Sequence, residues 1–440
     1  MKTLTFPAGG IHPPEQKEST EHKPIEDAPL PSRVVIPLQQ HIGAPCQALV
    51  KVKDPVSVGQ KIGEPKGFVS APVHASISGT VTAVGDMPHP MGRDVPSVVI
   101  ESDGEDRWFD GLVEAENFQD LSPDELKAKI LEAGIVGMGG ATFPTHVKLS
   151  PPPDKPIDTV IINGVECEPY LTADHRLMVE RPEEIIGGLE IFMQILSVGA
   201  GAIGIEQNKP DAIEVMTKLT AHRKDMTVVP LKVKYPQGAE KQLIKAILKR
   251  EVPSGGLPMD VGVVVQNVGT TASVYKAVRF GTPIIDRITT VTGPGIKVPR
   301  NLRIRIGTPF SEIIEFCGGF MGKTGKVISG GPMMGMTQYS LDVPVIKGTS
   351  GILIFRDEDL KLRESNACIR CGKCLEICPM GINPSLLGVY VEADAMEELE
   401  GARALDCIEC GSCAFVCPAA RPLVHLLRYG KADVLAKKKK

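Results

Sequence analysis

The spacing of hydrophobic positions changes along the chain, and each change predicts a different kind of structure. Residues 33–103 hold short runs such as VVIPL, ALVKV and SVVIES, separated by Gly and Pro, which is typical of a small all-β unit. Between 122 and 282 the apolar stretches alternate between strand and helix periods, which predicts an α/β unit with a largely parallel sheet. Short strands return between 284 and 356, where we expect a β-grasp-like unit.

The α/β region also has clear start signals. Ser122, Pro123 and Glu125 form a capping box with Pro at the first helical position, so a helix should begin there and run to Gly134. Further helices are expected at 182–197, 209–221 and 239–249, with strands at 157–163, 201–206, 226–234 and 261–266. Ligands in such sheets bind at the carboxyl ends of strands, so the residues that follow each strand are candidates for a site.

The remaining elements complete a predicted division of the chain. We expect a helix near 311–317, a largely helical insert from Leu386 to Glu400, and a short final helix at 421–429. The predicted units are an extended arm (1–30), a barrel-sandwich-hybrid-like β unit (31–110), an α/β unit (118–282), a β-grasp unit (283–356) and a cysteine-rich unit (357–440).

Composition excludes several classes of function. A formal charge of −4 gives no basic face for nucleic acid, and the N-terminus has no apolar core of the kind that a secretory signal requires. No stretch approaches the roughly 18 consecutive apolar residues of a spanning helix, so we expect no membrane crossing by this chain. Outside the cysteine motifs only Cys46, Cys167 and Cys317 remain, which favours a reducing compartment.

Two cysteine motifs are the strongest chemical signal. The sequences CIRCGKCLEICP and CIECGSCAFVCP share the spacing CxxCxxCxxxCP, which in bacterial ferredoxins supplies three thiolates to one [4Fe–4S] cluster and the fourth to its neighbour. This spacing predicts one cluster on Cys368, Cys371, Cys374 and Cys417, and a second on Cys407, Cys410, Cys413 and Cys378. Structural zinc usually takes separated CxxC pairs, and disulfides need an oxidising compartment, so neither alternative fits.

The N-terminal β unit resembles a known carrier fold. The segments VKDPVSVGQKIG and SAPVHASISGTVTAVG resemble sequences of the barrel-sandwich hybrid domain of lipoyl and biotinyl carriers. Where a carrier presents its modified Lys, this chain has Val73, His74 and Ala75. We therefore expect a structural or docking module, with His74 as a turn residue.

A second candidate site lies in the α/β unit. Gly137, Gly139 and Gly140 follow a helix, so they do not form the dinucleotide fingerprint, which needs a strand, a Gly turn and a helix in that order. Such a loop is either a plain turn or a ligand-binding loop, in which backbone N–H groups come close to an anion or a flat ring. In the second case Lys148 is near enough in the sequence to meet a phosphate. Downstream, Asn163, Glu166 and Glu168 follow a strand in NGVECEPYLTADHRLM.

These two stretches carry a family resemblance. GIVGMGGATFPTHVKL and NGVECEPYLTADHRLM resemble the paired flavin motifs of the respiratory complex I flavin subunit, and YPQGAEKQLI and VVVQNVGTTASV resemble two further segments of it. With the lipoyl-like unit in front, the β-grasp unit behind and the dicluster unit at the end, the order resembles the RnfC (RsxC) family of the Rnf electron-transport complex over essentially the full chain.

The resemblance implies particular contacts. For FMN it implies Gly137, Gly139, Gly140, Lys148, Asn163, Glu166, Tyr235, Gly238, Glu240, Gln266, Asn267 and Thr270. For NAD(H) it implies Phe143, stacked on the adenine, and Glu168 as the residue near the nicotinamide that serves hydride transfer. Five residues depart from the complex I pattern: Met138, Leu149, Val165, Ala239 and Gln266.

The function that this resemblance implies is electron transfer between NAD(H), FMN and two [4Fe–4S] clusters. The chain would be a peripheral subunit on the cytoplasmic face of the membrane, in an ion-translocating ferredoxin:NAD oxidoreductase. Its partners would be membrane and ferredoxin-like subunits of that complex, with ferredoxin reached indirectly. Two alternatives remain open: an electron-transfer adaptor that has lost nucleotide binding, and the flavin subunit of a soluble hydrogenase or formate dehydrogenase.

Overall fold

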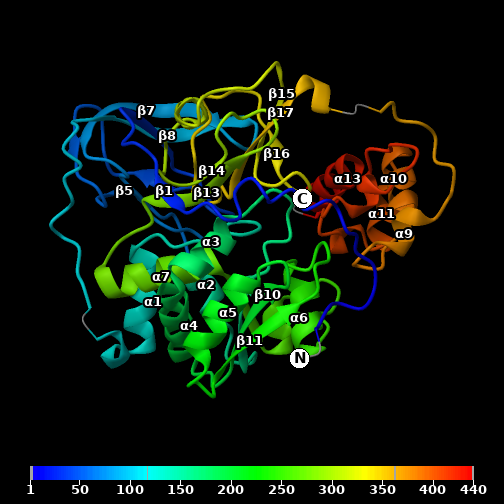
Figure 1. Ribbon diagram of the computed structural model, residues 1–440, viewed down its shortest axis with the longest axis horizontal. Coiled ribbons are helices and arrows are strands. Elements are labelled where there is room, and N and C mark those ends of the chain that lie inside the picture. The colour runs from blue at the N-terminus through cyan, green and yellow to red at the C-terminus, as the bar shows by residue number, and fades with distance from the viewer. Residues whose placement is uncertain (1–2, 116, 361–362, 439–440) are drawn as a thin grey trace.

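The computed structural model describes residues 3–115, 117–360 and 363–438 (Figure 1). The N-terminal β unit consists of two sheets, with strand orders β2-β8-β7-β4 and β3-β5-β6. Its strands are β2 (Arg33–Pro37), β3 (Gln47–Ala48), β4 (Pro55–Val56), β5 (Lys61–Glu64), β6 (Val73–His74), β7 (Gly79–His89) and β8 (Arg93–Ser102). The assignment of His74 to a turn is wrong, because it pairs with Lys61 inside β6 and is buried.

The α/β unit is built on a four-stranded sheet in which every pairing is parallel, in the order β11-β10-β9-β12. Its strands are β9 (Thr159–Gly164), β10 (Gly201–Glu206), β11 (Met226–Leu231) and β12 (Val263–Asn267). Its helices are η1 (Phe118–Asp120), α1 (Pro123–Glu132), α2 (Thr145–Lys148), α3 (Ala173–Glu180), α4 (Pro182–Leu196), α5 (Pro210–Thr220), α6 (Glu240–Leu248), η2 (Pro258–Val261) and α7 (Val268–Phe280). The predicted strands and the capping box of α1 are confirmed.

Helix α7 was not predicted, because VGTTASVYKAVRF contains Gly, Thr and Val, which are weak helix formers. Packing against α4 offsets this weakness. A Cβ atom at Gly188 of α4 would lie 2.1 Å from the carbonyl oxygen of Thr271, so the missing side chain allows the two helices to touch. At the N-terminus of α7 the Asn267 side chain accepts hydrogen bonds from the backbone N–H groups of Gly269 and Thr270.

The following unit is a mixed sheet in the order β1-β14-β13-β17-β15-β16, as expected of a β-grasp-like fold. Its elements are β1 (Ile25–Asp27), β13 (Asp286–Thr292), β14 (Arg300–Arg305), α8 (Phe310–Phe316), β15 (Thr324–Ser329), β16 (Met336–Thr337), β17 (Gly351–Arg356) and η3 (Asp357–Asp359). Strand β1 belongs to the N-terminal arm and pairs in parallel with β14.

The C-terminal cysteine unit is helical, with α9 (Lys373–Glu376), α10 (Pro384–Glu392), α11 (Met396–Gly401), η4 (Ala404–Asp406), α12 (Ser412–Phe415) and α13 (Leu423–Lys437). The expected largely helical insert from Leu386 to Glu400 is confirmed as α10 and α11, with a break between them at Asp394, whose φ is 54°. The final helix is longer than expected, since Leu427 and Val434 bury one stripe of α13 in the core of this unit.

The N-terminal arm crosses the other units. In Figure 1 its blue trace runs between the green α/β unit and the orange and red cysteine unit. The backbone N–H of Gly10 donates to the carbonyl oxygen of Ile377 at 2.8 Å, and Ile11 and Tyr235 exchange two backbone hydrogen bonds. The arm is therefore in contact with the two units that carry the candidate sites. Among the described residues, no helix is both long and apolar enough to cross a bilayer.

Candidate flavin and iron-sulfur sites

The two cysteine motifs share one backbone conformation. Arg370 and Gly372 in the first motif have positive φ angles of 57° and 77°, and Glu409 and Gly411 at the matching positions have 57° and 80°. A one-turn helix follows in each case, α9 or α12. Non-Gly residues rarely adopt this conformation, so its repetition marks two copies of the same loop.

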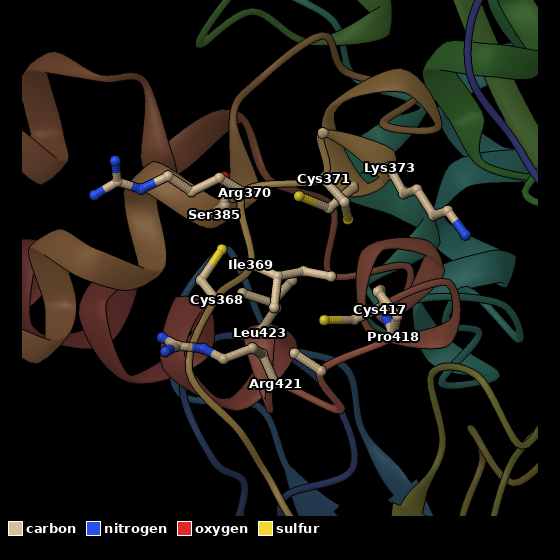
Figure 2. A pocket seen from close by; sticks show the side chains of 13 residues that line it. Cys368, Ile369, Arg370, Cys371, Lys373, Ser385, Cys417, Pro418, Arg421 and Leu423 are labelled. Carbon is tan, nitrogen blue, oxygen red and sulfur yellow. The ribbon is translucent and has the colours of Figure 1, made fainter.

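Each loop closes around a cavity. The first cavity is lined by Cys368, Cys371, Cys374 and Cys417, and Figure 2 shows labelled cysteine side chains arranged around it. The second is lined by Cys378, Cys407, Cys410 and Cys413. These are the two crossed sets that the spacing predicts. Four thiols spread around a cavity suit a polynuclear cluster, and within the described residues no three His, Cys, Asp or Glu side chains converge as ligands of a single metal ion.

The two cavities differ in exposure. Cys368 and Cys371 at the first are exposed, whereas Cys410 and Cys413 at the second are buried. Burial raises the pKa of Cys413 to about 12 and that of Cys407 to about 11, and iron, when bound, would stabilise these sulfurs as thiolates. The second loop is braced by α13, because Lys431 donates to the carbonyl oxygen of Cys407 at 2.7 Å.

The predicted flavin residues lie at the carboxyl edge of the parallel sheet. Asn163 and Asn267 are paired across β9 and β12, at the ends of those strands. Asn163 Nδ2 donates to the carbonyl oxygen of Gly238 at 2.8 Å, which brings the YPQGAEKQLI segment to the same edge. Lys148 and Glu240 form an ion pair of 2.5 Å between Nζ and Oε1.

The glycine loop rests on α7. The backbone N–H of Met138 donates to Thr270 Oγ1 at 2.8 Å, and that of Gly137 donates to the carbonyl oxygen of Phe143, also at 2.8 Å. Gly140 has a φ of 67°, and a Cβ atom built on it would meet no atom within 4 Å. The loop therefore presents open space beside Gly140, with its backbone fixed from behind.

Two residues of this site escaped the sequence analysis. Asp174, at the start of α3, accepts a hydrogen bond from Asn267 Nδ2 at 2.7 Å, while its own backbone N–H donates to Glu166 Oε1 at 2.7 Å. Burial, together with the charge of Glu166, raises the pKa of Asp174 to about 6. Arg287, from β13, is buried and donates to the carbonyl oxygen of Met138 at 3.1 Å. The polar run TADHRLM was a signal for Asp174, whereas no local pattern marks Arg287.

The residues present fit a flavin. Gln266 Nε2, at the end of β12, is buried and has no hydrogen-bond partner among the described residues. A buried amide without a partner is costly, and the carbonyl and nitrogen edge of a flavin ring offers acceptors. The open space at Gly140 can admit a flat ring, and Lys148, half-buried and paired with Glu240, would direct its remaining N–H donors to a phosphate.

Glu168 is linked to the second cysteine loop through Tyr235. Its carboxylate accepts from the backbone N–H of Met333 at 3.0 Å, and its Oε1 lies 3.4 Å from the Tyr235 hydroxyl oxygen. The Tyr235 hydroxyl donates its single proton to the carbonyl oxygen of Cys410 at 2.7 Å. Burial raises the pKa of Glu168 to about 7 and also raises that of Tyr235. A short polar contact thus joins the flavin loop to a cysteine of the second cavity.

Comparison with protein families gives an independent assignment for each unit. Residues 4–105 match the RnfC barrel sandwich hybrid domain, and residues 130–276 match the Nuo51 FMN-binding domain. Residues 288–337 match the SLBB domain, and residues 360–418 match the 4Fe–4S dicluster domain. The chain therefore has an FMN-binding domain and a dicluster domain, and its predicted fold class is confirmed.

Among solved structures, the chain is similar to one from an NAD⁺-reducing [NiFe]-hydrogenase in the H₂-reduced state. The TM-score is 0.50 at 18% sequence identity, over 74% of this chain and 68% of the other. This likeness concerns the fold alone.

Other relatives are much closer in sequence. The chain is 52% identical over 440 residues to the C subunit of the Na⁺-translocating ferredoxin:NAD⁺ oxidoreductase complex of Acetobacterium woodii, covering 100% of this chain and 99% of the relative. It is 53% identical over 426 residues to the C subunit of the proton-translocating ferredoxin:NAD⁺ oxidoreductase complex of Clostridium ljungdahlii, covering 97% and 93%. The chain belongs to the RnfC family of ion-translocating oxidoreductase complexes.

Proposed function

We propose that this chain passes electrons between NAD(H) and a one-electron partner, within an ion-translocating ferredoxin:NAD oxidoreductase. FMN, when bound, accepts or releases two electrons together at the nucleotide and exchanges them one at a time with iron-sulfur clusters. The chain would work at the cytoplasmic face of the membrane, beside membrane and ferredoxin-like subunits, with ferredoxin as the indirect electron donor. The names of the relatives, at 52% and 53% identity, support this assignment.

One observation carries the proposal. The Tyr235 hydroxyl, from the FMN-binding domain, donates to the carbonyl oxygen of Cys410 in the second cysteine loop. Around this bond Ile11, Tyr235 and Cys410 form a small buried apolar cluster. A dry contact between two redox-active regions is the arrangement that electron transfer requires, because it keeps the path short and holds both sides fixed.

The exposure of the two cavities supports an order for the centres. The second cluster, on Cys378, Cys407, Cys410 and Cys413, would stand next to the flavin domain. The first cluster, on Cys368, Cys371, Cys374 and Cys417, would face the redox partner, since Cys368 and Cys371 are exposed. Arg370 and Lys373 extend from the same loop (Figure 2), so the partner would meet a basic rim.

Residue roles follow from the contacts. Gly137, Gly139 and Gly140 would give the flavin close access to the backbone, and Lys148 would meet its phosphate. Asn163, Asn267, Thr270, Gly238 and Glu240 would hold the surrounding loops, with Glu166 fixing the start of α3. Phe143 is partly exposed and free to stack on the adenine ring. Glu168 would influence hydride transfer from its position beside Tyr235.

A direct test uses the full chain purified without oxygen. FMN and iron contents should show one flavin and two clusters, and NADH should bleach first the flavin and then the cluster absorbance. Clusters without flavin, or flavin that NADH does not reduce, would instead indicate the electron-transfer adaptor. The hydrogenase or formate dehydrogenase alternative predicts a different partner, and it would gain support if reduced ferredoxin failed to drive NAD⁺ reduction in the assembled complex.

A further inference from the structure

Lys17 in the N-terminal arm is a buried cation with an unusual set of partners. Its side chain is 4% exposed. Its Nζ donates to three main-chain carbonyl oxygens, those of Glu166 at 3.1 Å, Glu168 at 2.9 Å and Leu171 at a shorter distance. An ammonium group has three N–H donors, so this one is fully used by a single loop.

That loop contains two of the proposed flavin and nicotinamide residues. Between Glu166 and Leu171, both Glu166 and Tyr170 adopt positive φ angles, of 45° and 70°. Side chains other than Gly disfavour this conformation, so an interaction outside the loop has to maintain it. The arm supplies a second contact, because the backbone N–H of Tyr170 donates to the carbonyl oxygen of Glu15 at 2.8 Å.

A second buried lysine continues the pattern. Lys209, 1% exposed, donates to the carbonyl oxygen of Val165 at 2.8 Å. Its carboxylate neighbour Glu206 lies 3.7 Å away, so Lys209 has charge compensation of its own. By contrast, Lys17 directs all three donors at carbonyl oxygens. It comes from a segment 149 residues away from Glu166, so its contribution exists only when the arm is docked.

We propose that Lys17 is a positioning residue of the flavin site, which fixes the 166–171 loop so that Glu166 and Glu168 keep their places. This inference rests on the proposed function, since it takes that loop to be part of the FMN and nicotinamide site. Without the ammonium group, three carbonyl groups lose their donor at once, and the left-handed residues of the loop lose the contact that holds them. Glu166 would then no longer cap α3 at Asp174.

The structure offers a matched control. Lys234 lines the same open cavity as Lys17, and it also binds the arm, through the carbonyl oxygen of Phe6 at 3.1 Å. Among the described residues, however, its ammonium group donates to the arm and to no atom of the 166–171 loop. Lys234→Met therefore weakens the docking of the arm without removing the cation from the loop.

The experiment measures FMN affinity and loop protection in the full chain, with its clusters in place and its flavin removed. In Lys17→Met the dissociation constant for FMN should rise roughly tenfold or more, and backbone amides of the 166–171 loop should exchange hydrogen faster. Lys234→Met should change both far less. Wild-type affinity and protection in Lys17→Met, or equal effects in the two variants, would overturn the proposal.

A chemical rescue separates positioning from a general loss of folding. Lys17→Ala deletes a fragment the size of propylammonium, and the cavity gives that ion a route to the site. Propylammonium should restore FMN binding, whereas tetramethylammonium, which has no N–H donor, should not. A Lys17→Ala chain that neither folds nor binds FMN in propylammonium would overturn the proposal. A wild-type chain that binds no FMN would overturn the proposed function as well.

Discussion

The carboxyl group of Glu168 should make the stability of the folded chain depend on pH. Burial, only partly offset by the Met333 N–H donor, raises its pKa from 4.5 to about 7. A raised pKa means that the folded state holds the proton more tightly than the unfolded state. The protonated Glu168 carboxyl group therefore contributes its full stabilisation below pH 4.5, and this stabilisation is lost as the pH rises towards 7. Above pH 7 both states are ionised and the contribution is constant.

The size of the effect follows from the pKa values. One pKa unit corresponds to about 1.4 kcal/mol, so the whole window amounts to roughly 3 kcal/mol. Only about 1.4 kcal/mol of this falls between pH 6 and pH 8, the range in which iron-sulfur clusters are conveniently handled. Glu168→Gln mimics the protonated acid, because an amide still accepts from Met333 and can donate to the Tyr235 hydroxyl oxygen. We expect this variant to be more stable than wild type at pH 8 and equal to it at low pH.

The assay is thermal or urea unfolding of the flavin-free chain at several pH values from 6 to 8, for wild type and Glu168→Gln. Glu214→Gln, an exposed site on α5, is the control for loss of a carboxylate. The difference between wild type and Glu168→Gln should widen with pH, while the difference for Glu214→Gln stays flat. Parallel pH profiles for all three would refute the reasoning, since they would show that Glu168 is ionised throughout.

Three other substitutions test ligands and contacts. Cys378→Ala should lose about half of the iron and one of the two cluster signals in EPR. The control Cys317→Ala, in the core of the mixed sheet, should keep both cluster signals. Two intact clusters in Cys378→Ala would exclude the crossed ligand sets. Tyr235→Phe removes the hydrogen bond to Cys410, so the free energy of unfolding should fall by roughly 1 kcal/mol. Electron transfer from flavin to cluster should also slow in stopped-flow traces. An unchanged rate would remove this contact from the electron path. Gln266→Leu should weaken FMN binding roughly tenfold without lowering the melting temperature of the flavin-free chain, and a stability loss with normal binding would contradict the assignment.

The periodic parts of this fold could be predicted because their determinants are local. Strands β9 to β12 carry apolar runs that are visible in the sequence. The capping box at Ser122 marks the start of α1 with residues only three positions apart. Helix α7 was missed since its sequence holds weak helix formers, and its stability comes from contacts such as that between Gly188 and Thr271. The break at Asp394 likewise has no local Gly or Pro signal.

The candidate site divides in the same way. The cysteine spacing predicts both ligand sets, because ligation within each motif is a matter of a few residues along the chain. Asp174 was within reach, in a polar run after a predicted strand. Arg287 and Lys17 could not be predicted, because each reaches the flavin loops from another unit. Both donate to backbone carbonyl oxygens, which every residue has, so the sequence around those carbonyls does not reveal the contact.

The contact between flavin domain and second cluster shows why these residues lie where they do. Ile11, Tyr235, Met333 and Cys410 meet in one apolar cluster, and they come from the arm, the α/β unit, the mixed sheet and the cysteine unit respectively. A contact assembled from four separated segments forms only when all four are folded. A contact within one segment could form before the rest of the chain has folded around it, and water could then reach it. Because electron transfer between two centres depends steeply on their separation, such a shared contact makes the spacing a property of the complete chain. The arm then serves two purposes with one stretch, closing this cluster at Ile11 and fixing the flavin loop at Lys17.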